Sequence, residues 1–130
     1  MVDISEKDFE AYVAKAIDNI PDLYRRHLDN VAFLIEDEPT PDQRRRLNLY
    51  VNETLFGLYE GVPLPQRGGA AKILPDKITL FRLPLTRASA NLEDFKKKLA
   101  HTIWHEVAHY YGLDHARIHE LEYKNARPKL

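Results

Sequence analysis

One stretch near the end of the chain, HEVAHYYGLDH at residues 105–115, constrains the fold more than any other. On a helix, two histidines four positions apart lie about 40° apart around the axis and one turn apart along it. His105 and His109 can therefore direct ring nitrogens toward one metal ion. Glu106 lies on the flanking side of the same turn, where a carboxylate can reach a water on that ion without binding the metal. The stretch thus predicts a helix that presents a metal site.

The preceding residues have the features of such a helix. Asn91, with Asp94 three positions later, is a typical helix start. Gly112 can adopt the left-handed conformation that ends a helix and reverses the chain. The apolar residues between these ends recur at helical spacing and predict a buried stripe that faces away from the histidines: Leu92, Phe95, Leu99, Ile103 and Val107.

The third metal ligand follows from the rest of the motif. A catalytic zinc site has three protein ligands and one open position. A turn at Gly112 would return the chain over the helix and bring His115 to the metal, which completes the pattern H-E-x-x-H-x-x-G-x-x-H. Asp114 and His119 remain alternatives, although a helix cap and local packing are simpler roles for them. His101 would lie about 12 Å from His109 along the axis, so we expect it to face solvent or to hydrogen-bond a ligand.

Composition narrows the class of protein. The length of 130 residues suits one domain, residues 1–130, and 44% hydrophobic with 30% charged residues is typical of a folded protein. A net charge of -1 gives no reason to expect a nucleic acid or a membrane as partner, and the basic runs at 44–46 and 96–98 have acidic neighbours, as solvated helix faces do. There is no cysteine to bind metal. The acidic N-terminus and the lack of an apolar run of about 20 residues favour the cytoplasm.

The remaining elements are predicted from apolar spacing and from helix caps. Pro84 indicates either that the second strand lies at a sheet edge or that the strand ends there. If it is an edge, an extended peptide could add to it as a further strand. Helices are expected from Ser5 to Ile20, from Pro21 to Leu28, over 40–60 and from about Asp114 to Tyr123. Strands are expected over Val31–Ile35, which should be buried, and over Ile78–Leu85. Residues 61–69 are expected to form a loop.

The chain resembles the minimal zincin-like family of short bacterial proteins, which are regarded as metallopeptidases. The resemblance covers roughly residues 5–39 and 56–124, and rests on the histidine motif, EDEP at 36–39, GLYEGVPL at 57–64, and PDKITLFR at 75–82. It implies an α+β, zincin-like fold in which a small sheet packs against the motif helix, with additional N- and C-terminal helices. It also implies a zinc ion held by His105 and His109, with Glu106 as general base.

Two features depart from related patterns. His115 occupies a position where this family often has aspartate. The methionine turn that lies beneath the zinc of metzincins is absent, because the only methionine is Met1.

The sequence therefore predicts a zinc-dependent hydrolase of the metallopeptidase type. In this hypothesis His105, His109 and His115 hold Zn2+, Glu106 activates a water, and the partner is a peptide or protein substrate. The alternative is a non-catalytic protein that binds zinc for structure or regulation, or binds a partner. Exchangeable water at the metal favours the enzyme, and a fourth protein ligand such as His119 favours the alternative. No residue pattern points to an oligomeric state, and Tyr110, Arg117 and Tyr123 are equal candidates for stabilising an oxyanion.

Overall fold

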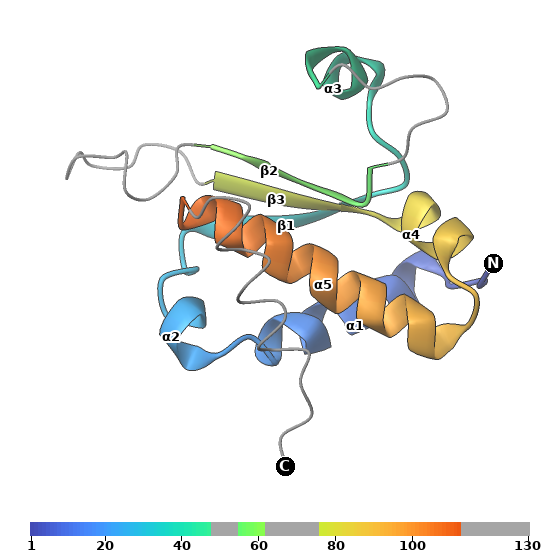
Figure 1. Cartoon of the computed structure of the whole chain (residues 1–130), viewed down its shortest axis with the longest axis horizontal. Helices are drawn as coiled ribbons and strands as arrows, with labels where there is room; N and C mark the ends of the chain where they lie inside the picture. The colour runs from blue at the N-terminus through green and yellow to red at the C-terminus, as the bar shows by residue number, and fades with distance from the viewer. Residues whose placement is uncertain (48–54, 62–75, 113–130) are drawn as a thin grey trace.

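A computed structural model of the chain describes residues 1–47, 55–61 and 76–112. Helices and strands are mixed along these residues, which confirms the predicted α+β class (Figure 1). None of the helices in these ranges has the length and apolarity needed to cross a membrane. The elements are α1 (Glu6–Asp18), α2 (Asp22–Arg25), β1 (Val31–Glu36), α3 (Pro41–Arg46), β2 (Gly57–Glu60), β3 (Asp76–Phe81), α4 (Arg82–Ala88) and α5 (Leu92–Tyr110).

The three strands form one sheet in the order β1-β3-β2, with β1 parallel and β2 antiparallel to β3. Since β3 has a strand on each side, all of its residues except Lys77 are buried. The prediction that this strand could lie at a sheet edge, and that a peptide could add to it there, is therefore wrong. The strand instead ends at Phe81, and Pro84 lies in the first turn of α4. Backbone N–H groups in the first turn of a helix have no helical acceptor, so proline, which has no N–H, is tolerated there.

The apolar run Val31–Ile35 forms a strand as predicted, but it is not a buried strand. Within the described sheet β1 pairs only with β3, and of its residues only Val31 is buried. Leu34, on the face away from α5, is 38% exposed. A continuous apolar run does not reveal whether a strand has one neighbour or two, and here it has one.

The helix expected over residues 40–60 is confirmed only at its start. Thr40 and Gln43 form the capping box of α3, with the Thr40 hydroxyl accepting from the Gln43 amide at 3.1 Å and the Gln43 side chain accepting from the Thr40 amide at 2.9 Å. Residues 57–60 are strand β2, and 48–54 lie outside the described residues. Glycine at position 57 disfavours a helix and permits the close packing on α5 described below.

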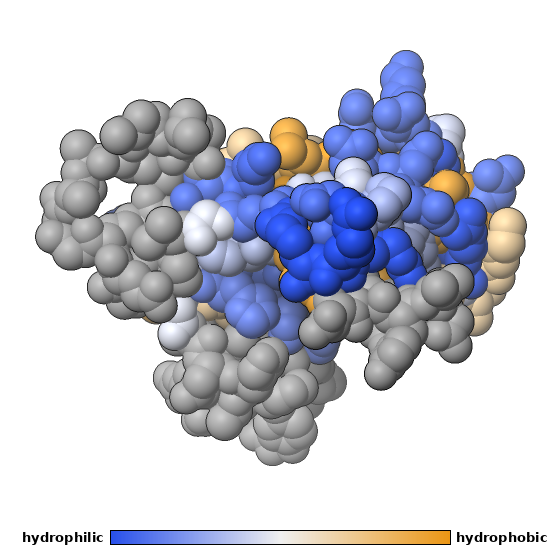
Figure 2. All heavy atoms as spheres, turned by 90° about the horizontal axis from the view of Figure 1, so that it is seen from above, coloured by the Kyte–Doolittle hydropathy of each residue, from blue (hydrophilic) through white to orange (hydrophobic). Residues whose placement is uncertain are grey.

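The basic run 44–46 lies on α3, where Arg45 and Arg46 are exposed to solvent, as predicted, and Arg44 is half-buried. Hydrophilic side chains gather over this helix when the molecule is seen from above (Figure 2). Arg46 forms ion pairs with Asp42 at 3.2 Å and with Glu60 at 2.9 Å. The second pair joins α3 to the end of β2.

The long helix α5 begins and ends where the sequence indicates. The Asn91 side chain accepts from the Asp94 amide at 2.9 Å, and Gly112 beyond the last turn has φ 72°. Of the predicted stripe only Leu92, in the first turn, is exposed, at 39%. The other four residues are fully buried: Phe95, Leu99, Ile103 and Val107.

Helix α5 packs against β2 and β3 on one side and against α1 on the other (Figure 1). Phe9 and Val13 of α1 are buried, and the rings of Phe9 and Phe95 lie 5.8 Å apart. Burial of each such side chain contributes about 1.5–3 kcal/mol, so α5 is held firmly beneath the sheet. The N-terminal helices α1 and α2 confirm two further predictions, whereas the helix expected over 114–123 lies outside the described residues.

Candidate metal centre and active site

His105 and His109 lie on one face of α5, one turn apart, and both are half-buried. Their ring centroids are 4.8 Å apart and their planes cross at 77°. Two rings at this spacing can direct nitrogens at one ion about 2 Å from each, and neutral imidazole is a ligand that suits zinc. The pair therefore fits the metal that the motif implies.

Of the other histidines near the motif, His101 lies within the described residues and His115 and His119 lie outside them. His101 is exposed, as predicted, with its ring stacked 6.4 Å from that of His105. No group of three or more potential ligands occurs within residues 1–47, 55–61 and 76–112. His115 and its alternatives Asp114 and His119 lie outside those residues, so the third ligand stays a prediction.

Glu106 is a buried carboxylate next to the histidine pair. Its side chain is 8% exposed, and its Oε1 accepts a hydrogen bond from the backbone amide of Tyr59 at 3.0 Å. Burial raises the pKa of Glu106 from 4.5 to about 7, although the Tyr59 amide acts in the opposite direction. No ion pair to Glu106 occurs among the described residues. Within the part of the chain that the structure describes, the Tyr59 amide holds the carboxylate and no cation offsets its burial.

The pairing of β2 explains why the Tyr59 amide reaches Glu106. The Phe81 amide donates to the Phe56 carbonyl at 2.9 Å across the antiparallel pair. In such a pair, the backbone N–H and C=O groups of every second residue point toward the partner strand. The backbone groups of Phe56 and Leu58 therefore point toward β3, and those of Gly57 and Tyr59 point toward the outer edge of the sheet. The Glu106 carboxylate thus lies beside the outer edge of β2.

Gly57 permits this close approach of strand and helix. A Cβ at this position would stand 2.7 Å from Thr102 Cγ2 and 3.3 Å from Glu106 Cγ, both on α5. The first distance is shorter than side-chain carbons tolerate, so any larger residue would push β2 away from the helix. Because residue 57 has no side chain, β2 can lie close enough to α5 for the Tyr59 amide to donate to Glu106.

The Tyr59 side chain fixes the other end of β2. Its hydroxyl donates to Oδ2 of the buried Asp76 at 2.6 Å, and its ring contacts the Tyr110 ring at 6.1 Å. Tyr110 is itself buried, and its hydroxyl donates to the His27 carbonyl at 3.1 Å. Tyr110 therefore has a packing role, while Arg117 and Tyr123, the other oxyanion candidates, lie outside the described residues.

Sequence reasoning missed the contributions of β2 to this site. It places Gly57 and Tyr59 in a helix, in which their backbone groups would be bonded internally. The signal that could have revealed the strand is the run Phe56-Gly57-Leu58-Tyr59, since aromatic residues beside a glycine favour extended structure over a helix.

Comparisons with known proteins agree with this geometry. A family model described as zincin-like metallopeptidase matches residues 28–125. The fold resembles the solved structure of a conserved hypothetical protein from Thermus thermophilus, with a TM-score of 0.58 and 20% identity over 83% of this chain and 94% of that one. A search of curated proteins finds no match. The family match covers most of the chain and includes the histidine motif, and the chain therefore belongs to the zincin-like metallopeptidase family.

Proposed function

We propose that this chain is a zinc-dependent peptidase in which His105, His109 and His115 hold the ion and Glu106 is the general base. The observation that carries the proposal is the buried Glu106 carboxylate beside the histidine pair. A buried carboxylate that has no ion-pair partner among the described residues costs free energy, and a residue with only a packing role would avoid that cost. Such groups cluster at catalytic sites, where a perturbed pKa serves the reaction.

The residues of the site divide the chemistry between them. His105, His109 and His115 would hold the zinc ion, which would lower the pKa of a water and polarise the substrate carbonyl. Glu106 accepts a proton from the attacking water and passes it to the leaving amine. The Tyr59 amide restricts rotation of the carboxylate by holding one of its oxygens. Burial raises the pKa of the Glu106 carboxyl and so makes its carboxylate a stronger base for the first transfer.

The outer edge of β2 supplies a place for the substrate. Backbone groups of Gly57 face this edge, and an extended peptide can add to such an edge through main-chain hydrogen bonds. A peptide bound there would run alongside Glu106 and the histidine pair. This assigns to β2 the substrate-binding role that the sequence suggests for the strand at 78–83.

Metal content and turnover test the proposal together. We expect about one zinc per chain by mass spectrometry in the wild type and in Glu106→Gln, and none in His109→Ala. The exposed His101→Ala variant is the control and should keep the metal. Cleavage of a peptide library should be lowered by about 10²- to 10⁴-fold in Glu106→Gln, because a general base contributes about that much.

The outcomes separate this proposal from its rival. Zinc binding with no cleavage by the wild type would identify a structural or regulatory metal instead. Turnover that survives in Glu106→Gln would refute the assigned mechanism. For the third ligand, the zinc affinity of His115→Ala should fall far below that of the wild type, whereas Asp114→Ala and His119→Ala should bind zinc normally.

A further inference from the structure

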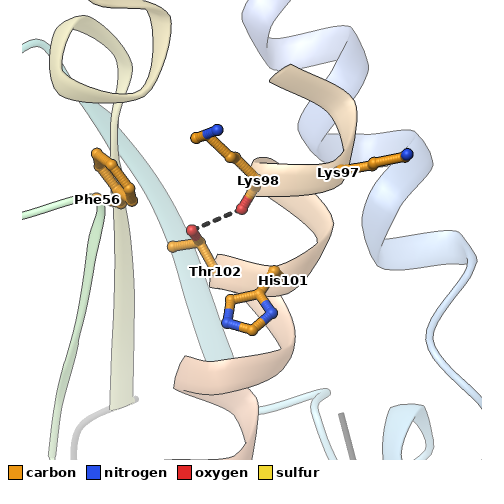
Figure 3. A pocket seen from close by; sticks show the side chains of 5 residues that line it. All are labelled: Phe56, Lys97, Lys98, His101 and Thr102. Atoms are coloured by element: carbon orange, nitrogen blue, oxygen red, sulfur yellow. Dashed lines mark hydrogen bonds between the residues drawn. The ribbon is translucent and has the colours of Figure 1, made fainter. Parts of the chain in front are cut away.

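A pocket of about 260 Å³ opens between α5 and the residue that precedes β2. It lies beside the turn of α5 that precedes the one carrying His105 and Glu106. Ligand pockets for cofactors or drug-sized molecules usually have about 300–1,000 Å³, so this one suits a single amino-acid side chain better than a whole small molecule. The residues around it are Phe56, Lys97, Lys98, His101 and Thr102 (Figure 3).

Two of the polar side chains around the pocket, those of Lys98 and Thr102, already have hydrogen-bond partners. The Lys98 ammonium lies 2.8 Å from both carboxylate oxygens of Asp94. The Thr102 hydroxyl donates to the Lys98 carbonyl at 2.7 Å, and the Lys97 side chain points away from Phe56 (Figure 3). The surfaces left to contact an occupant are the Phe56 ring, the Thr102 methyl group and the aliphatic part of Lys98. The lining therefore suits an apolar occupant.

The position of the pocket relates it to the reacting centre. The His101 ring at its border lies 6.4 Å from the ring of His105. An extended peptide rises about 3.3 Å per residue, so this distance corresponds to about two residues. Phe56 directly precedes Gly57, the start of the strand edge along which we place the substrate. A side chain in the pocket would thus belong to a residue close to the scissile bond.

We propose that this pocket is a substrate subsite for one large apolar side chain, aromatic or long aliphatic, within two residues of the scissile bond. Phe56 is its specificity-determining residue. An acidic side chain is the less favoured occupant, because Asp94 pairs with Lys98 and the Lys97 side chain points away from Phe56 (Figure 3). The inference rests on the proposed peptidase function, since that function places a peptide along β2.

Binding and cleavage are measured separately to test it. The zinc-loaded Glu106→Gln protein is titrated with labelled peptides that differ at one position, bearing Phe, Leu, Ala or Glu, and the wild type is given the same peptides for cleavage. We expect the peptides bearing Phe or Leu to bind and to be cleaved at least about tenfold better than the peptide bearing Ala. Phe56→Ala, added to each protein, should abolish this ratio, and the loss of affinity should be larger for the Phe and Leu peptides than for the Ala peptide.

Two further variants serve as matched comparisons. Lys98→Met removes the ammonium but keeps the aliphatic chain, so it should retain the apolar preference. Lys96→Ala changes a lysine that lies over the Tyr12 ring, away from the pocket, and should have no effect. Zinc content and thermal melting verify that each variant folds. If Phe56→Ala does not fold, Phe56→Leu should still lower the preference for Phe over Leu severalfold.

Each outcome bears on one proposal or on both. A preference for Glu that Lys98→Met abolishes and Phe56→Ala retains would overturn the apolar subsite in favour of a cationic one. Cleavage without any preference near the scissile bond, or with one that Phe56 does not affect, would overturn the subsite and leave the peptidase. Phe56-dependent binding without cleavage by the wild type would refute the peptidase, and with it the placement of the pocket beside a scissile bond, and would leave a pocket that binds apolar side chains of peptides. Peptides that neither bind nor are cleaved would refute both.

Discussion

Glu106→Gln should change how the stability of the metal-free protein depends on pH. Burial raises the pKa of Glu106 from 4.5 to about 7, so the folded protein binds this proton more tightly than the unfolded chain. The resulting stabilisation is complete below pH 4.5 and is lost as the pH rises through about 7. Glutamine has nearly the same shape, can accept the same bond from Tyr59 and does not titrate.

The magnitude follows from the size of the shift. About 2.5 pKa units correspond to about 3 kcal/mol in the free energy of unfolding, since each unit is worth about 1.4 kcal/mol. Most of this difference should develop between about pH 5 and pH 8. The other titratable groups, including the histidines, are present in both proteins and cancel in the comparison. Relative to the wild type, the glutamine variant should therefore gain about 2–3 kcal/mol over this range.

The assay is urea denaturation of both proteins in the presence of a chelator, at intervals from about pH 5 to pH 8. Repeating it with zinc should shrink the difference, because a nearby cation favours the charged carboxylate. Profiles that run parallel within about 0.5 kcal/mol, the usual error of such comparisons, would refute the reasoning. They would mean that Glu106 is solvated or paired in solution.

Three further perturbations have expected outcomes. Gly57→Ala should lower the free energy of unfolding by about 1–3 kcal/mol in urea titrations and should reduce turnover, because the new Cβ would stand 2.7 Å from Thr102 Cγ2. Stability and turnover equal to those of the wild type would contradict the close packing of β2 on α5. Phe95→Ala should cost about 3–5 kcal/mol by the same assay, against less than about 0.5 kcal/mol for the exposed Leu92→Ala; similar losses would contradict the assigned core. Zinc at about 100 times its dissociation constant should stabilise the wild type by about 3 kcal/mol, measured by thermal melting, and leave His109→Ala unchanged; equal shifts in both would place the metal elsewhere.

The parts of the fold that the sequence predicted well depend on local interactions. Helix α5 begins at the Asn91 cap and ends before Gly112, because both devices act within a single turn of the helix. The sequence Thr40-Pro41-Asp42 likewise indicated the start of α3, which Thr40 caps in the structure. The histidine spacing could be interpreted for the same reason, since residues four apart on a helix always share a face.

The errors arose where a distant segment decides the structure. The run from Ile78 to Leu85 is mostly apolar, and its pattern does not show where the strand ends; pairing with strands on both sides limits β3 to Asp76–Phe81. The assignment of residues 57–60 to a helix failed in the same way, because β2 is stabilised by β3 and by α5 rather than by its own sequence. Local propensity is a weak guide to such segments.

The same distinction separates the reactive groups of the site from the group that holds them. His105, Glu106 and His109 are identified by side-chain type, whereas the Tyr59 contact to Glu106 is a backbone amide, which every residue except proline possesses. Its position depends on β2 lying against α5, which in turn requires that residue 57 have no Cβ. A chain could therefore keep the complete histidine motif and still misplace the carboxylate at position 106 through one change at position 57. For that reason the motif alone is weaker support for catalysis than the motif together with the packing of β2.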